Sequence, residues 1–107
     1  MSIAPTPPAP YYAVIFTSTR TSADQGYEAM AAAMAKLAAQ QPGFLGMESA
    51  RDSIGITVSY WEDLEAIAAW QRNAAHLVAQ QHGRELWYGT FKTRICRVER
   101  DYGFQRE

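Results

Sequence analysis

Residues 60–88 hold all three tryptophans and both histidines of the protein. The stretch begins with a strand-like pattern that ends at Trp61, and Asp63 then provides a good helix N-cap. The apolar residues that follow recur at steps of three and four, which predicts an amphipathic helix that ends at Gly83. Its apolar stripe consists of Leu64, Ile67, Trp70, Ala74 and Leu77. Any chemistry of the protein is therefore expected to border this segment.

The first part of the chain shows one strand pattern and one helix pattern. Residues 11–19 are rich in aromatic and β-branched side chains, which suit a half-buried strand. Ser22 and Gln25 have the spacing of a capping box, so we expect the first helix to start there. The helix should end at Gln41, because Pro42 disfavours helical geometry in the residue before it. Its apolar stripe consists of Tyr27, Met30, Met34 and Leu37.

Three further stretches are predicted to be strands, namely residues 44–51, 56–61 and 87–98. Turn residues between the first two of these predict an antiparallel hairpin. Gly46 lies inside the earlier strand and indicates a bulge or a close approach of another backbone.

The last predicted strand carries apolar residues at both parities. One face holds Phe91, Thr93 and Ile95, whereas Cys96 falls on the other. Either both faces are covered, or a bulge near Arg97 shifts the register. Cys96 is interpreted as a small buried hydrophobic residue, with a reactive thiol as the alternative.

The order strand, helix, strand, strand, helix, strand is that of an α+β ferredoxin-like β-α-β-β-α-β fold, with one antiparallel sheet and helices on one face. The uncovered face would still carry apolar side chains, and such a face marks an interface or a ligand cavity. A homodimer with its two sheets packed face to face would cover it. We expect a single domain over residues 11–107, preceded by a proline-rich arm over residues 1–10 that lies on a surface or is disordered.

Composition excludes several classes of function. The formal net charge of −1 gives no reason to expect a nucleic acid or an anionic membrane as partner. No apolar run approaches the roughly 18 residues that a membrane span needs, and the first ten residues lack the features of a secretory signal. A single cysteine excludes an internal disulfide and a multi-cysteine metal site, which fits a reducing cytoplasm. We expect a cytoplasmic protein.

Two short motifs resemble those of a known family. Residues 42–48, Pro-Gly-Phe-Leu-Gly-Met-Glu, follow the first predicted helix, and residues 60–67, Tyr-Trp-Glu-Asp-Leu-Glu-Ala-Ile, join a strand to an acidic helix start. Over about residues 11–102 the chain resembles the antibiotic biosynthesis monooxygenase superfamily of dimeric α/β-barrel proteins, and residues 75–88 resemble its stand-alone members without an assigned activity. The superfamily includes cofactor-independent oxygenases of polycyclic aromatic substrates, quinol oxygenases and haem-degrading oxygenases.

The resemblance to haem-degrading members is incomplete. These members pair a helix tryptophan with an iron-ligating histidine further along the helix and an asparagine on the first strand. Trp70 matches the tryptophan, but the histidine position falls on Gln80, and residues 11–19 contain no asparagine. Iron ligation by His76 or His82 from a shifted place is the alternative.

The cofactor-independent reaction implied by the resemblance requires a base. Such an enzyme removes a proton from a phenol or enol and stabilises the anion. Histidine suits this task at neutral pH, which makes His76 the candidate base. Asn73 and Gln80 lie within one helical turn of it, on the flank of the helix beside Trp70, where they would orient the base or bind a substrate oxygen. The alternative is a solvated helix flank.

Trp61, Trp70 and Phe16 are the candidate flat walls for an aromatic ligand. For Trp70 the alternative is a role as core anchor. The chain has no glycine-rich phosphate loop, no paired catalytic carboxylates at a recognisable spacing and no nucleophile motif. The resemblance therefore implies a monooxygenase that uses neither cofactor nor metal and acts on a small aromatic or quinol-like substrate. The alternatives are a haem-binding or haem-degrading protein and a non-catalytic ligand-binding dimer.

Overall fold

The computed structural model describes residues 2–81 and 87–106, and among these the side chains of all but residues 78–81. The predicted helix end at Gly83 and the alternative iron ligand His82 lie outside the described residues.

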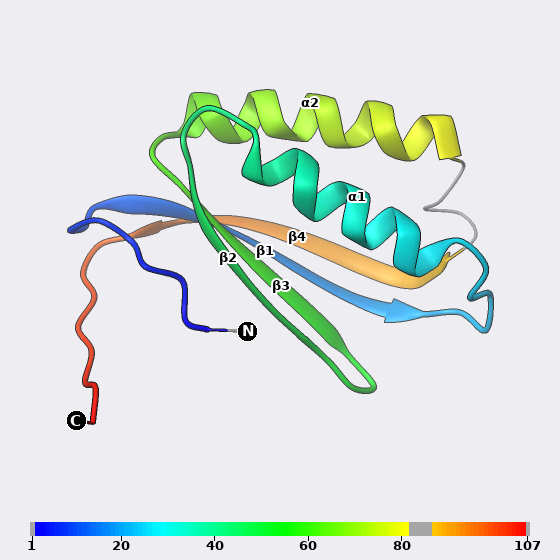
Figure 1. Cartoon of the computed structure of the whole chain (residues 1–107), viewed down its shortest axis with the longest axis horizontal. Coiled ribbons are helices and arrows are strands. Elements are labelled where there is room, and N and C mark those ends of the chain that lie inside the picture. Colours follow the sequence, from blue (N-terminus) through cyan, green and yellow to red (C-terminus); the bar gives the residue numbers. More distant parts are fainter. Residues whose placement is uncertain (1, 82–86, 107) are drawn as a thin grey trace.

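The chain folds into one four-stranded sheet covered by two helices. The elements are β1 (Tyr11–Arg20), α1 (Tyr27–Ala39), β2 (Phe44–Arg51), β3 (Gly55–Trp61), α2 (Leu64–Gln81) and β4 (Tyr88–Val98). The strand order is β2-β3-β1-β4 and all neighbours are antiparallel. Both helices lie on one face of the sheet (Figure 1), so the ferredoxin-like fold is confirmed. Each predicted strand agrees with the observed one to within one residue at either end.

The β2–β3 hairpin contains the irregularity that Gly46 indicates. The pairing register of the two strands shifts between Phe44 and Gly46, which confirms the predicted bulge. A close approach occurs at the same place, because a Cβ atom on Gly46 would lie 2.8 Å from the Cβ atom of Ala4. The absence of a side chain at this position lets the N-terminal arm lie directly against β2.

In the β1–β4 pair, the register shift lies between Thr19 and Arg20. The bulge near Arg97, one of the two predicted alternatives, is absent from this pairing. Cys96 pairs with Ala13 on the face of the sheet away from the helices. Its side chain is half-buried rather than buried as predicted.

The start of α1 differs from the prediction. No side-chain hydrogen bond caps the helix, and its N-cap is Gly26, which has a left-handed φ of 82°. The segment from Ser22 to Gln25 is instead held by Trp87, the residue before β4: Trp87 Nε1 donates to the Gln25 carbonyl at 3.0 Å, and Arg20 Nε donates to the Trp87 carbonyl at 3.1 Å. The capping-box prediction is therefore wrong, because contacts with a residue far away in the sequence determine the backbone of this segment.

The start of α2 agrees with the prediction. Asp63 Oδ1 accepts a hydrogen bond from the Ala66 amide at 2.8 Å, which is the N-cap geometry. The residue after it, Leu64, is 54% exposed, so this member of the predicted stripe is not part of the core. Leu64 is the first residue of α2 and lies only three positions after Trp61, the last residue of β3.

The hydrophobic core lies between α2, the end of α1 and the central strands. Trp61 is fully buried, and its ring stacks on that of Trp70 with centroids 5.8 Å apart. The Trp61 indole nitrogen donates to Ser59 Oγ at 2.9 Å, so its polar atom is satisfied. The buried cluster consists of Val14, Ala38, Trp61, Ile67 and Trp70.

The N-terminal arm and the segment after β4 lie on the side of the sheet that the helices leave uncovered (Figure 1). The Ala4 amide donates to Glu48 Oε2 at 2.8 Å, and Tyr60 donates to Glu48 Oε1 at 2.7 Å. Beside Tyr60, with ring centroids 5.9 Å apart, Tyr11 donates a hydrogen bond to the Asp101 carboxylate from the segment after β4. No helix in the described part of the chain is long and apolar enough to cross a membrane.

Candidate functional site

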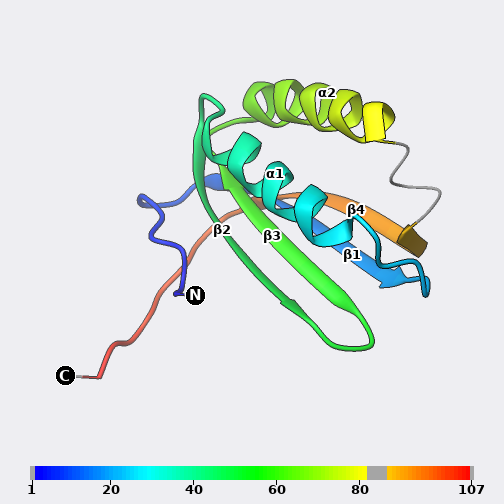
Figure 2. The same ribbon diagram turned by 45° about the vertical axis from the view of Figure 1, so that its right-hand side comes forward.

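A cavity of about 700 Å³ lies between the helices and the sheet. This volume falls within the roughly 300 to 1,000 Å³ typical of small-molecule sites. Both helices and all four strands contribute to its wall. Figure 2 shows the two helices as a layer over the sheet, with the β2–β3 hairpin extending beyond α1. The apolar part of the wall includes Val14, Phe16, Met30, Met34, Met47 and Trp70.

The cavity exists because α1 is rich in alanine. The helix presents Met30 and Met34 to the space, with Ala31 and Ala35 beside them. Alanine side chains are too short to fill the volume between a helix and a sheet, so the interior is left open here rather than close-packed. Methionine is flexible and polarisable, and a wall of this kind adapts to ligands of different outline.

Two tyrosines give the cavity a polar group at its β4 end. Tyr27 and Tyr88 both line the space, and their ring centroids are 6.0 Å apart. Burial raises the pKa of Tyr88 to about 12, and the neighbouring Tyr27, which shares a hydrogen bond with it, adds to this increase. The Tyr88 hydroxyl is therefore protonated at neutral pH, where it can donate a hydrogen bond.

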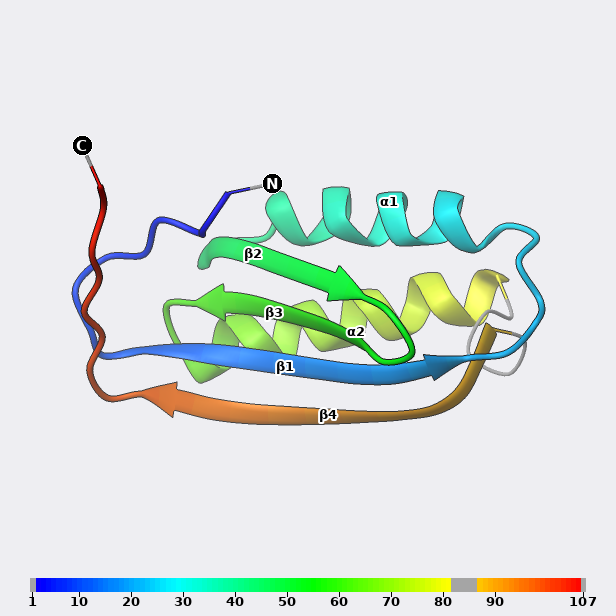
Figure 3. The same ribbon diagram turned by 90° about the horizontal axis from the view of Figure 1, so that it is seen from below.

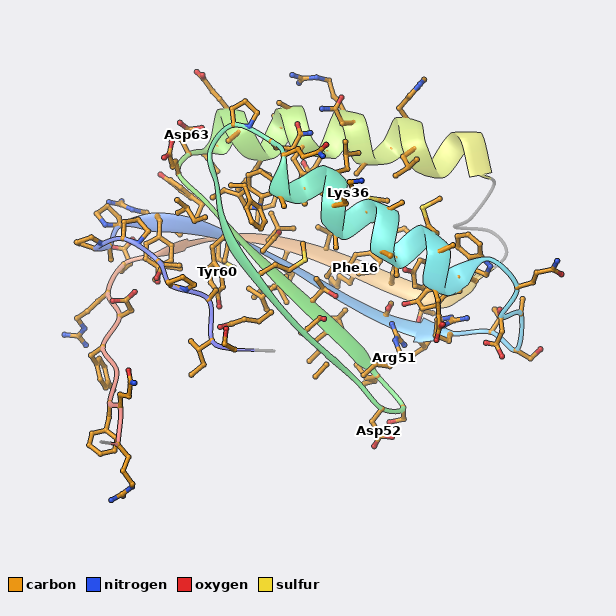
Figure 4. All side chains as sticks on the ribbon, viewed as in Figure 1. Phe16, Lys36, Arg51, Asp52, Tyr60 and Asp63 are labelled. Atoms are coloured by element: carbon orange, nitrogen blue, oxygen red, sulfur yellow. The ribbon has the colours of Figure 1, made fainter. Side chains whose placement is uncertain are left out.

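Arg51 forms part of the wall at the tip of the β2–β3 hairpin (Figure 4). Its guanidinium reaches across to β1, where Nη1 donates to the Ser18 carbonyl at 3.4 Å and Nη2 donates to Ser18 Oγ. The space for this side chain comes from Gly55, because a Cβ atom there would lie 2.1 Å from the Arg51 Cζ atom.

The predicted wall residues divide into two groups. Phe16 and Trp70 line the cavity, and Figure 4 shows Phe16 between α1 and the sheet. Trp61 does not line it, because the ring lies behind Trp70 in the core. Trp70 thus serves both predicted alternatives, since it is 7% exposed within the core cluster and also borders the cavity.

The predicted catalytic residues lie on a different side of α2. The cavity meets this helix at Trp70, Gln71 and Ala74, whereas Asn73 and His76 are exposed. Asn73 Nδ2 donates to Gln41 Oε1 at 2.8 Å and so links α2 to the end of α1. The side chain of Gln80 lies outside the described residues.

Sequence reasoning missed the polar groups Tyr27, Tyr88 and Arg51 as parts of a site. Tyr27 could have been identified from the sequence, because it belongs to the predicted apolar stripe of the first helix and is the one residue of that stripe with a hydroxyl group. Arg51 and Tyr88 lie at the ends of strands, where only the pairing register shows which side chains meet. In the part of the chain that the structure describes, no three His, Cys, Asp or Glu side chains are grouped so that they could hold a metal ion.

Comparison with known proteins shows which family the chain belongs to. The family model described as antibiotic biosynthesis monooxygenase matches residues 10–82. The uncharacterized protein YqjZ of Bacillus subtilis (strain 168) is 47% identical over 105 residues, which cover 96% of this chain and 92% of that protein.

Solved structures share the fold at low sequence identity. The crystal structure of SnoaB, a cofactor-independent oxygenase from Streptomyces nogalater, matches with a TM-score of 0.71 and 20% identity, over 87% of this chain and 97% of that one. The structure of PA3566 from Pseudomonas aeruginosa matches with a TM-score of 0.67 and 19% identity, over 88% and 97% of the two chains. The extent of the family match and the identity to YqjZ show that this chain belongs to the antibiotic biosynthesis monooxygenase family.

Proposed function

We propose that this protein is a cofactor-independent monooxygenase that acts on a small aromatic or quinol-like substrate. The observation that carries the proposal is the apolar cavity walled by Trp70 and Phe16, with the Tyr88 hydroxyl at one end. Membership of the monooxygenase family and the fold shared with SnoaB, itself described as a cofactor-independent oxygenase, support it.

The reaction requires the substrate to supply the electrons. A phenol or enol loses a proton, and its anion then transfers an electron to O₂. Recombination forms a carbon–oxygen bond, and loss of water leaves one oxygen atom in the product as a carbonyl group. Both electrons that reduce the second oxygen atom to water come from the substrate. The protein contributes by orienting a flat ring against Trp70 and by stabilising the developing anion.

The proposal includes two candidates for removal of the substrate proton. The first is His76, the residue expected from the sequence, with Asn73 and Gln80 as its orienting neighbours. The second is water within the cavity, with the substrate anion stabilised by a hydrogen bond from Tyr88. A hydrogen bond to the substrate anion lowers the pKa of the substrate hydroxyl, so a weaker base suffices to remove its proton.

Oxygen uptake with a panel of anthrones and naphthoquinols tests the function. We expect saturable O₂ consumption by the wild type. Phe16→Ala should lower kcat/KM by about tenfold through loss of a ring wall, which corresponds to about 1.4 kcal/mol. Arg72→Ala, at an exposed position on α2, is the matched control and should have no effect. O₂ uptake no faster than in buffer with every substrate would overturn the proposal.

His76→Ala decides between the two proton acceptors. If His76 is the base, kcat falls by about two orders of magnitude or more, and the acidic limb of the pH profile disappears with it. Unchanged kcat and an unchanged profile would assign proton removal to water. Asn73→Ala provides the companion measurement, because it also removes the hydrogen bond to Gln41 and its stability must be determined alongside its activity.

We also propose that the protein is a homodimer that packs through the sheet face opposite the helices, the face seen in Figure 3. This face carries half-buried Ile15 and Val58, and Ile56 beside them is 45% exposed. Light scattering should give twice the 12.0 kDa of one chain. Ile56→Glu should lower the mass to that of one chain, whereas Ile54→Glu, in the hairpin turn and 50% exposed, should not. A wild-type mass near 12.0 kDa at micromolar concentration would contradict the dimer.

A further inference from the structure

We infer that the tip of the β2–β3 hairpin supplies an anion subsite to the cavity, with Arg51 at its centre, and that the ligand is therefore an aromatic carboxylic acid. This inference rests on the proposed function to the extent that it takes the same cavity as the ligand site. It adds the substrate class: flat, apolar over most of its length, and negatively charged at one end.

The position of Arg51 follows from the pairing register of β2. Side chains on a strand alternate between its two faces, and the cavity side of β2 carries Met47, Ser49 and Arg51. The wall thus changes along one strand from apolar to polar to cationic. A ligand whose ring lies beside Met47 has its far end directed toward the guanidinium.

Arg51 has no carboxylate partner among the described residues. The ion pairs there are Arg20 with Asp24 and Arg97 with Glu99, and the hydrogen bonds of Arg51 go to the neutral oxygen atoms of Ser18. A guanidinium has five N–H donors, so donors remain after these two bonds are made. The planar group matches a carboxylate in a bidentate arrangement, which is shorter and stronger than a hydrogen bond between neutral groups.

The surroundings of the guanidinium add to the preference for an anion. The positive charges of Arg51 and Arg20 both act on the Tyr88 hydroxyl, where they oppose the effect of burial on its pKa. The guanidinium carbon of Arg20 lies 3.3 Å from the centre of the Tyr27 ring. Arg20 is paired with Asp24, so the groups that favour negative charge on a ligand at the hairpin end of the cavity are the Arg51 guanidinium and the protonated Tyr88 hydroxyl.

The position of the Arg51 guanidinium depends on the absence of a side chain at Gly55. It stands opposite Arg51 in the hairpin, and a Cβ atom there would lie 2.1 Å from both Cζ and Nη2 of Arg51. An alanine at this position would push the guanidinium away from Ser18 without removing its charge. Two variants thus test the same site by different means, one through charge and one through position.

The experiment compares two fluorescent ligands of the same shape at neutral pH, anthracene-2-carboxylate and the neutral anthracene-2-carboxamide. We expect the wild type to bind the carboxylate about tenfold more tightly, and Arg51→Gln to abolish this preference while the Kd for the carboxamide changes by less than about twofold. Gly55→Ala should reduce the preference in the same direction. Arg72→Gln, at an exposed position on α2, is the matched control and should retain the wild-type preference.

Equal affinity of the wild type for the two ligands, or an unchanged preference in Arg51→Gln, would overturn the inference. The outcome is separable from that of the proposed function. O₂ uptake with neutral quinols together with no carboxylate preference would remove the subsite alone. A carboxylate preference that disappears in Arg51→Gln, without O₂ uptake on any substrate, would support the subsite and remove the monooxygenase.

Discussion

Trp61 and Trp70 stack with their ring centroids 5.8 Å apart and their planes inclined by 21°. Trp61 belongs wholly to the core, whereas Trp70 also borders the cavity. The position of the cavity wall therefore depends on the packing of a residue that no ligand would touch. The hydrogen bond from Trp61 Nε1 to Ser59 Oγ fixes the orientation of the inner ring.

Ser59→Ala should destabilise the protein by about 1 to 3 kcal/mol, because the buried indole N–H of Trp61 would lose its acceptor. Urea unfolding followed by tryptophan fluorescence measures the difference. Ser53→Ala, at an exposed position in the hairpin turn, is the control and should be nearly neutral. A Ser59→Ala variant as stable as the control would mean that the indole finds another acceptor.

Gly43→Ala should destabilise the protein by more than about 1 kcal/mol. The glycine has a φ of 84°, which disfavours other residues, and an added Cβ atom would lie 2.6 Å from the Cβ atom of Ala66 on α2. Thermal unfolding by circular dichroism provides the comparison. Gly103→Ala, where nothing lies within 4 Å of the added atom, should leave Tm unchanged, and an equal Tm for both variants would refute the steric argument.

Removal of the α2 cap should lower stability by about 1 kcal/mol in Asp63→Ala. Asp63→Asn retains an oxygen acceptor and is expected to stay close to the wild type, because asparagine is about as good an N-cap as aspartate. Denaturant midpoints of the three proteins decide the matter. If asparagine were as damaging as alanine, the contribution would come from charge at the helix start rather than from the hydrogen bond.

Alkaline pH should destabilise the wild type more than Tyr88→Phe. The pKa of Tyr88 is raised from 10.0 to about 12 in the folded protein, so the unfolded chain releases the proton first as pH rises. The stability linked to this group is complete below about pH 10 and is lost as pH rises to about 12. With partial exposure taken into account, the loss is about 1 kcal/mol.

Urea midpoints of wild type and Tyr88→Phe, measured on both sides of pH 10, check this expectation. Between the lower and the higher pH, the urea midpoint of the wild type should fall by more than that of Tyr88→Phe. Tyr102→Phe, at an exposed position, is the control and should follow the wild type. Parallel pH profiles for wild type and Tyr88→Phe would show that burial does not hold the Tyr88 proton.

Local pattern predicted most of the fold. Strand alternation, the Asp63 cap and the bulge at Gly46 all depend on residues a few positions apart, and each is confirmed. The failure at Ser22 and Gln25 has the opposite origin. The capping box was locally consistent, but hydrogen bonds between Arg20, Trp87 and Gln25 hold that segment in another conformation.

The candidate site was only partly predictable. Trp70 and Phe16 were identified because flat aromatic side chains suit the wall of a site for an aromatic ligand. Asn73 and His76 were grouped because the helical periodicity places them on one flank of the helix. The periodicity alone does not show which flank of α2 borders a cavity. The structure places that border at Gln71 and Ala74.

The sequence by itself determined the order of strands and helices, the positions of the turns and the resemblance to a family, because periodicity and turn chemistry act over short distances along the chain. Only the tertiary structure decided that Arg51 meets Ser18, 33 positions away, and that Tyr27 meets Tyr88. These contacts depend on the strand register and on the unfilled volume beneath an alanine-rich helix. The register and the volume both result from the packing of the whole chain.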